Sequence, residues 1–532
     1  MRTTLRRVAV VVLAAVVLAR WVLHHREAAS GASRGRPASA AAQPLPPLPP
    51  VAGAGDADVL VMGRLTLHAC EIGSRRDTGL PTAGAYCTTL AVPEDWHAPR
   101  GRQIRLKVAI VKADTPEPAA DVVTFLDGGP GGAATDDWPE VAPAFEPLRQ
   151  RHDMLLIDQR GTGGSNALDC PQLQGAGDSP ALPARADQPQ TMIRLLQQCL
   201  AQLQGHAAPQ FYTTTEAVRD LEAVREAVGG PRLDIVGISY GTRLAQQYAA
   251  RYPDSVRSVV LDSAVPNSLA LLSEHARNLE HALRLLFARC RAQPACAQRF
   301  PDPYATLYRV RDRLRAHPQL VQLRDPVSFQ PLQLTLTAAD LAAVVRFYAY
   351  SPLTAALLPL MLSAADQGNY APLLGQKKWL ADDLGDQITS GMELSVVCAE
   401  DADLLSPRVQ DEDSLLGNDA IRQIKAACAV WPRGTRPAHF HSPWISPLPT
   451  LVLAGQFDPV TPPAYGRQIV RTLTSARLLI VPGAGHGVIG AGCMPRLVAR
   501  FVDTLDAAAL DASCLQRLGG VPAFLNYNGA GP

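Results

Sequence analysis

Ser239 lies between two glycines in the sequence GISYG, where two different residue patterns meet. The run LDIVGI before it is typical of a buried strand, and the run GTRLAQQYAARYP after it has the periodicity of a helix. Gly237 and Gly241 lack the side chains that would collide where a strand turns sharply into a helix, and such a turn presents a serine hydroxyl to a cleft. The pattern predicts a serine nucleophile, with a serine that only caps the helix as the alternative.

A serine hydroxyl is a weak nucleophile at neutral pH, so it needs a base that is itself oriented by an acid. Asp458 follows the strand-like run TLVLAG, and His486 lies in a glycine-flanked loop after the run RLLIV. Because the three side chains follow three different predicted strands in the order serine, aspartate, histidine, we expect them to form a catalytic triad. Asp262, at the end of the run RSVVLD, is the alternative acid.

The negative charge that develops on a substrate carbonyl oxygen requires N–H donors that already point at it. The segment LDGGPGG, residues 126–132, overlaps the end of a strand-like run and allows its main chain to approach a ligand closely. We expect the main-chain N–H groups of Gly129 and Tyr240 to be the donors. The segment DQRGTGGS, residues 158–165, follows the next strand and is expected to support this region through Asp158 and Arg160.

The strand-like runs indicate the fold class. IRLKVAIV, from residue 104, alternates polar and apolar residues as an antiparallel strand with one wet face does, whereas later runs are continuously apolar, as buried parallel strands are. Helical patterns such as TTEAVRDLEAVREAVG separate several of these runs. The sequence therefore predicts an α/β protein, with a mostly parallel sheet flanked by helices.

The order of patterns also suggests domain boundaries. Three arginines precede an apolar run from Val8 to Ala19, which indicates either a cleaved export signal or a membrane anchor within residues 1–25. Residues 26–58 are rich in alanine and proline and are predicted to form a linker. A core in two parts, residues 59–266 and 445–532, is expected to flank a helical cap inserted at residues 267–444, where strand patterns disappear.

Composition excludes some classes of function. The 532 residues include 50 basic and 49 acidic ones, which leave a formal net charge of +1, and 47% are hydrophobic. This is the composition of a core-forming globular protein, without the basic excess that favours nucleic acid, and membrane contact is expected only through the N-terminal segment.

Ten cysteines form five well-separated sequential pairs, and behind an export signal they favour disulfides in an oxidising compartment, either periplasmic or extracellular. Neighbours joined in order would close short local loops, and reduced core cysteines are the alternative. The sequence contains no CxxC pair. His439 and His441 are spaced to share a strand face but have no third ligand nearby, so no metal site is predicted.

The motifs GGPGG, DQRGTGGS, GISYG, QFDPVTPP and GAGHG together resemble the prolyl and tripeptidyl aminopeptidase family of α/β-hydrolases, in its secreted bacterial branch with a TAP-like C-terminal region. The resemblance spans roughly residues 60 to 522. It implies that Ser239 is the nucleophile, Asp458 the acid and His486 the base, and that the insertion is a cap that admits only the N-terminus of a peptide. Proline iminopeptidases have histidine before the glycine-rich motif where this chain has Asp127, which favours the tripeptidyl-like branch.

An exopeptidase of this kind must recognise a free α-ammonium group, for which a buried carboxylate in the cap is the natural partner. Glu400 and Asp401, close to Cys398, are the candidates, and two solvated carboxylates at a helix start are the alternative. The predicted function is a serine exopeptidase that releases a single residue or a tripeptide through an acyl-enzyme, without a cofactor. A secreted carboxylesterase with the same triad is the alternative, and a non-catalytic binding module is a remote one.

Overall fold

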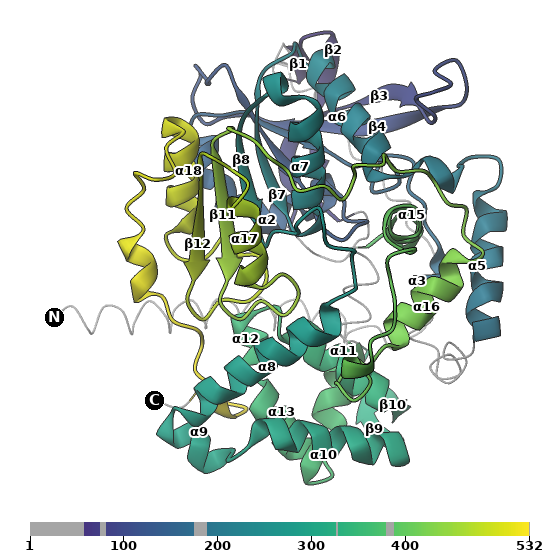
Figure 1. Ribbon diagram of the computed structural model, residues 1–532, viewed down its shortest axis with the longest axis vertical. Helices are drawn as coiled ribbons and strands as arrows, with labels where there is room; N and C mark the ends of the chain where they lie inside the picture. Colours follow the sequence, from purple (N-terminus) through teal and green to yellow (C-terminus); the bar gives the residue numbers. More distant parts are fainter. Residues whose placement is uncertain (1–57, 75–80, 175–188, 326–327, 379–387, 531–532) are drawn as a thin grey trace, which may run out of the picture. The chain divides into compact units, whose positions relative to one another are not determined.

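The computed structural model describes residues 58–74, 81–174, 189–325, 328–378 and 388–530. The predicted export signal or anchor and nearly all of the predicted linker lie outside these residues. A ten-stranded sheet forms the centre of the described chain, with the strand order β1-β2-β3-β4-β6-β5-β7-β8-β11-β12 (Figure 1). Its strands are β1 (Val59–Met62), β2 (Leu65–Ile72), β3 (Ala83–Pro93), β4 (Gln103–Val111), β5 (Val122–Leu126), β6 (Met154–Ile157), β7 (Leu233–Ile238), β8 (Val256–Asp262), β11 (Thr450–Gly455) and β12 (Ala476–Val481).

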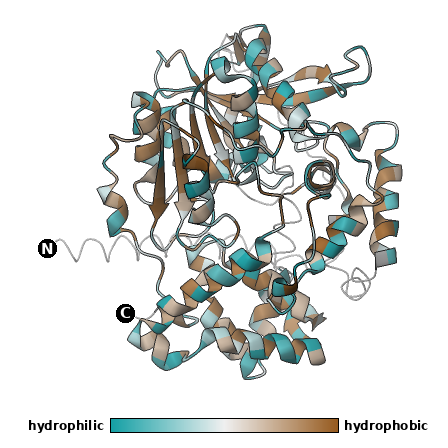
Figure 2. Ribbon diagram, in the orientation of Figure 1, coloured by the Kyte–Doolittle hydropathy of each residue, from teal (hydrophilic) through white to brown (hydrophobic). Residues whose placement is uncertain are grey.

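The sheet is mixed in the way the residue patterns predict. Strands β1 to β4 form an antiparallel meander, and β4 pairs antiparallel with β6. The remaining neighbours, from β6 through β5, β7, β8 and β11 to β12, are parallel. Strand β4 alternates exposed and buried residues at its start, whereas every residue of β5 and β11 is buried. Figure 2 shows hydrophobic residues along β11 and its neighbour β12.

Two hydrophobic clusters hold helices against the two faces of the sheet. One cluster joins the sheet to α6 (Thr214–Ala227), α7 (Tyr240–Arg251) and α17 (Pro463–Val470). The other joins it to α2 (Ala134–Arg149) and α18 (Met494–Thr504). These layers are the α/β arrangement predicted from the alternation of strand and helix patterns. Because β5, β7, β8, β11 and β12 run parallel, their carboxyl ends lie at the same edge of the sheet.

The chain between β8 and β11 is mainly helical, as predicted. It contains α8 (His275–Arg291), α9 (Pro294–Arg299), α10 (Pro303–Ala316), α11 (Ala338–Tyr348), α12 (Pro352–Ala355), α13 (Leu358–Asp366), α15 (Ser390–Glu400) and α16 (Asp419–Cys428). The expectation that strand patterns disappear here was wrong in one place, because β9 (Gln319–Arg324) and β10 (Pro331–Leu336) form an antiparallel hairpin. Both strands alternate between more and less exposed residues, and the inner ones pack on the helical core of the insertion.

A segment outside the predicted insertion also packs against the helices of the insertion. Helices α3 (Pro171–Gln174) and α5 (Pro189–Leu203) come between β6 and β7, and α5 shares a hydrophobic cluster with α15 and α16. The short elements are the 3-10 helices η2 (Pro209–Phe211), η3 (Pro253–Ser255), η4 (Val409–Asp411) and η5 (Ser513–Arg517), and the strands β13 (Phe524–Asn526) and β14 (Gly529–Ala530).

All ten cysteines form disulfides between sequence neighbours: Cys70–Cys87, Cys170–Cys199, Cys290–Cys296, Cys398–Cys428 and Cys493–Cys514. Five such bonds are typical of an exported protein. Within the described ranges, no helix has both the length and the apolar character needed to span a membrane.

Candidate active site

The bend between β7 and α7 carries Ser239 with a φ of 56° and a ψ of −121°, a main-chain conformation that is rare outside glycine. A Cβ at Gly237 would lie 2.5 Å from the carbonyl oxygen of Gly241, and a Cβ at Gly241 would lie 2.1 Å from that of Leu126. Glycine is therefore required at both positions for the bend to form. The side chain of Ser239 does not cap α7, so the helix-cap interpretation fails and the hydroxyl is left for another role.

His486 and Asp458 meet at the ends of two strands. His486 Nδ1 lies 2.9 Å from Asp458 Oδ2, and the carboxylate also accepts the N–H groups of Val460 and Thr461 and the Thr461 hydroxyl, each at 2.8 Å. Burial raises the pKa of Asp458, but His486 and the two N–H donors outweigh it and hold the pKa below its ordinary value. Burial lowers the pKa of His486, but Asp458 reverses this effect and raises it.

Asp262, the alternative acid, accepts hydrogen bonds from main-chain N–H groups. Its carboxylate accepts the N–H groups of Val488 and Ile489 at 2.7 Å each, just after His486, and burial raises its pKa to about 6. The Ser239 hydroxyl has no hydrogen-bond partner among the described residues. Catalytic hydrogen bonds often form fully only when substrate is bound, so this geometry is compatible with a triad of Ser239, Asp458 and His486.

The glycine-rich segment after β5 lies directly against Ser239. A Cβ at Gly128 would be 3.2 Å from the Ser239 Cβ, and Gly129 and Gly131 have φ angles of 109° and 118°. Gly129 and Tyr240 line one small cavity together with Ser239. Tyr240 is the first residue of α7, and the N–H groups at a helix start have no acceptor within the helix. The two predicted oxyanion donors are therefore close to the predicted nucleophile.

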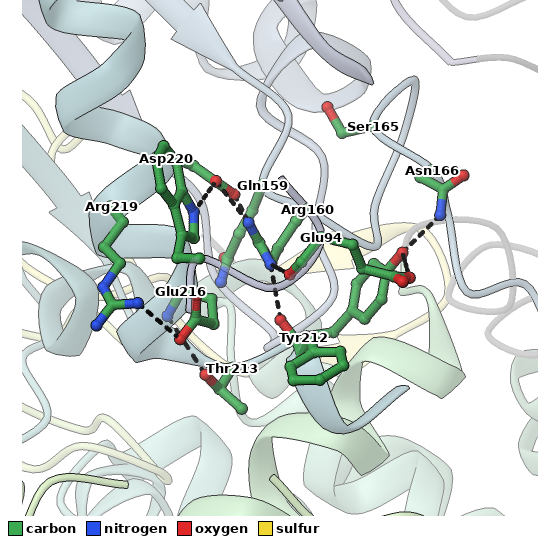
Figure 3. Close-up of polar contacts among 12 residues, drawn as sticks. Glu94, Gln159, Arg160, Ser165, Asn166, Tyr212, Thr213, Glu216, Arg219 and Asp220 are labelled. Carbon is green, nitrogen blue, oxygen red and sulfur yellow. Dashed lines mark hydrogen bonds and ion pairs between the residues drawn. The ribbon is translucent and has the colours of Figure 1, made fainter. Parts of the chain in front are cut away.

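The segment after β6 supports this region through buried polar contacts. The Arg160 side chain is fully buried and donates to both oxygens of Asp220 at 2.6 Å, and to the main-chain oxygens of residues 93, 94 and 211 (Figure 3). Asp158 accepts hydrogen bonds from the main chain and hydroxyl of Thr135. Gln159 donates to the hydroxyl of Tyr240 at 3.0 Å. These contacts give Asp158 and Arg160 the structural role that the sequence suggested.

Glu400 and Asp401 are not at the cavity. Both are fully buried, and Arg243 of α7 donates to Asp401 at 2.7 Å and lies 3.7 Å from Glu400. Glu400 accepts the main-chain N–H and the hydroxyl of Thr214, at the start of α6, and burial raises its pKa to about 7. His441 contacts the main-chain oxygen of Glu400. The predicted amine-binding pair thus connects α15 to α6 and α7.

The carboxylate that does line the cavity is Glu393, two helical turns before Glu400 on α15. The start of α15 is attached to the glycine-rich segment, because Thr389 donates its N–H to the carbonyl oxygen of Gly131 at 3.0 Å. Glu393 follows one turn later. Sequence reasoning missed this residue, because the helical period of α15 brings Glu393 and Glu400 to similar faces and does not indicate which turn lies over the cleft.

The cavity is also lined by Arg346 of α11, His275 of α8 and Tyr350, which lies just beyond α11. The main-chain oxygen of Tyr350 accepts the main-chain N–H of His486 at 2.8 Å, and the Tyr350 ring centroid is 5.0 Å from that of the histidine ring. Arg346 lies 3.2 Å from His275 Nδ1. Two larger hollows, of about 750 and 600 Å³, lie along α8, and Ser239 lines neither of them.

Comparisons with known proteins agree with this architecture. The chain is 24% identical over 458 residues to Serine protease Hip1 of Mycobacterium tuberculosis (strain ATCC 25618 / H37Rv), covering 79% of this chain and 85% of that one. It is 25% identical over 461 residues to Tripeptidyl aminopeptidase of Streptomyces coelicolor, covering 80% and 82%. It is 27% identical over 457 residues to Carboxylesterase B of Mycobacterium tuberculosis (strain CDC 1551 / Oshkosh), covering 78% and 84%.

Two of these relatives are named as peptidases and one as an esterase. The similarity to them supports hydrolysis as the general function of this chain. Residues 121–490 match the family described as alpha/beta hydrolase fold, and this range extends from β5 through the loop that carries His486. The chain therefore belongs to the alpha/beta hydrolase family.

Proposed function

We propose that the protein is a serine exopeptidase that removes N-terminal residues from peptides, with Ser239 as the nucleophile. The observation that carries this proposal is the position of Glu393. Its side chain lines the same cavity as Ser239, and it has neither an ion pair nor a side-chain hydrogen bond within the part of the chain that the structure describes. A peptidase that acts only at a free N-terminus must bind the α-ammonium group, for which a buried carboxylate is the natural partner.

The electrostatics of Glu393 support an ammonium ligand. Burial raises its pKa and the positive charge of Arg346 only partly opposes this, so the ionised carboxylate lacks sufficient compensation from the protein. The α-ammonium of a peptide would supply the missing charge through a charge-assisted hydrogen bond. Because α15 is attached to the glycine-rich segment at Gly131, an ammonium held by Glu393 would lie at a constant distance from the oxyanion donors.

The proposed reaction is acyl transfer to Ser239. His486 takes the proton of Ser239 as the hydroxyl oxygen attacks the scissile carbonyl carbon, and Asp458 stabilises the resulting imidazolium. The N–H groups of Gly129 and Tyr240 stabilise the oxyanion. His486 then gives its proton to the leaving amine, which leaves an acyl-enzyme on Ser239. Water, deprotonated by His486, hydrolyses that ester and releases the N-terminal fragment.

The test compares amide substrates that have one to three residues before the scissile bond, each with a free or an acetylated N-terminus. The wild type is expected to cleave the free forms at least tenfold faster, since the acetylated forms cannot form the charged contact. Ser239→Ala should abolish cleavage. Glu393→Gln should raise KM for free substrates and reduce the difference between free and acetylated forms.

Glu412→Gln is the matched control, because Glu412 is an exposed carboxylate that pairs with Arg422. It should behave like the wild type. Equal cleavage of free and acetylated amides would refute the exopeptidase proposal. Hydrolysis of a short-chain ester without cleavage of any amide would favour the carboxylesterase alternative, to which the similarity to Carboxylesterase B also points.

A further inference from the structure

A positive charge lies in the same cavity as Ser239 and Glu393. Arg346, on α11, lines the cavity and is half-buried. Its guanidinium contacts His275 Nδ1 at 3.2 Å and lies 5.3 Å from the ring of its neighbour Phe347, and it forms no ion pair with any carboxylate of the described residues. By contrast, the fully buried Arg160 and Arg243 are each paired with an aspartate.

The unpaired guanidinium disfavours charge on the neighbouring histidines. Burial lowers the pKa of His275 well below its ordinary value, and Arg346 lowers it further. Arg346 also opposes the effect of Asp458 on the pKa of His486. Because the charge of Arg346 acts to lower the pKa of the proposed base His486, it disfavours proton transfer to that base unless an anion compensates it. Glu393 lines the same cavity and Arg346 partly offsets the burial that raises its pKa, but the two side chains do not form an ion pair, and no other carboxylate of the described residues pairs with Arg346.

The position of Arg346 places its ligand close to the reacting bond. Arg346 precedes Tyr350 by one helical turn, and Tyr350 binds the main chain of His486. Glu393 follows the attachment of α15 to Gly131 by one helical turn. Two different helices thus contribute opposite charges to the cavity, a carboxylate from α15 and a guanidinium from α11.

We propose that Arg346 binds a carboxylate of the substrate, and that the preferred substrates are therefore peptides with an acidic group next to the scissile bond. This inference rests on the proposed exopeptidase function. Glu393 binds the α-ammonium, and the planar guanidinium of Arg346 binds the carboxylate with two parallel hydrogen bonds. The same chemistry has two sources, an aspartate or glutamate side chain and the C-terminal carboxylate of a very short peptide.

The experiment measures kcat/KM for wild type, Arg346→Gln, Arg346→Lys and the control Arg277→Gln, where Arg277 is a half-exposed residue that lines the outer hollows. The substrates are peptides of the length that the wild type cleaves best. One pair has glutamate or glutamine beside the scissile bond with an amidated C-terminus. A second pair has only neutral side chains and a free or an amidated C-terminus.

The wild type and Arg277→Gln should prefer the carboxylate-bearing member of at least one pair by roughly tenfold to a hundredfold, which is the value of a hydrogen bond to a charged group. The pair that shows the preference identifies the source of the carboxylate. Arg346→Gln should lose this preference, because its rate falls mainly on the carboxylate-bearing member of the pair. Arg346→Lys should retain part of the preference, since it keeps the charge and loses the bidentate geometry.

Two results would overturn the inference while leaving the proposed function intact. One is cleavage of free N-termini by the wild type without any preference for a carboxylate. The other is an equal loss of rate on both members of each pair in Arg346→Gln, which would mean that Arg346 only orients His275. Failure of the wild type to cleave any peptide with a free N-terminus would instead refute the exopeptidase proposal.

Discussion

Replacement of Arg160 by methionine is expected to be among the most destabilising single changes outside the hydrophobic core. Methionine keeps much of the volume but removes five donated hydrogen bonds, two to Asp220 and three to main-chain oxygens of β3, its following residue and η2. Asp220 is also buried and would retain the N–H of Trp96 as a side-chain donor. Removing one partner of a buried ion pair costs about 3–5 kcal/mol, a large part of the about 5–15 kcal/mol that stabilises a typical domain.

The free energy of unfolding should be measured by urea denaturation of the oxidised protein, for Arg160→Met, Asp220→Asn and the double variant. The double variant should be less destabilised than the sum of the single changes, because the uncompensated charge is removed together with its partner. Arg309→Met is the control, since Arg309 forms an exposed pair with Asp366 and should cost less than about 1 kcal/mol. A loss below about 1 kcal/mol for Arg160→Met, or strict additivity in the cycle, would refute this account.

Two other changes test the roles of neighbouring charges. The rate should rise with pH through a transition above about 6.5, the ordinary pKa of histidine, because His486 must be neutral to accept a proton and Asp458 raises its pKa. Asp458→Asn should move that transition to lower pH and reduce kcat; an unchanged transition in a pH–rate profile would contradict the assignment of Asp458. Asp401→Asn should destabilise the protein by about 3–5 kcal/mol, because Arg243 is fully buried against it, and leave the ratio of rates on free and acetylated substrates unchanged. A collapse of that ratio without loss of stability would return amine recognition to Asp401.

Local features of the site could be predicted from the sequence because they depend on short-range sterics. The bend at Ser239 requires glycine two residues before and after it, and each of these requirements is visible in five consecutive letters. The positions of Asp458 and His486 just after strands are also local patterns, and the parallel pairing of those two strands then brings the side chains together. The pairing of sequential cysteines has a similar basis, because short loops bring neighbours together.

Other features depended on which turn of a helix lies over the site. Glu393 and Glu400 lie on the same helix, and only the packing of α15 against the glycine-rich segment and α6 decided that the first lines the cavity and the second is buried against Thr214. Likewise, nothing around Arg346 in the sequence distinguishes it from a solvated helical arginine. The hairpin β9–β10 was missed because its alternating pattern is short and its stability comes from the helices on which it packs.

The sequence by itself therefore determined the nucleophile bend, the order of the predicted triad and the α/β class, since each arises from steric limits or periodicity within a few residues. The tertiary structure alone decided which charges share the cavity with Ser239 and which are neutralised inside the protein. Burial and ion pairing depend on contacts between segments far apart in the chain, such as α7 with α15, and a linear pattern does not contain those contacts.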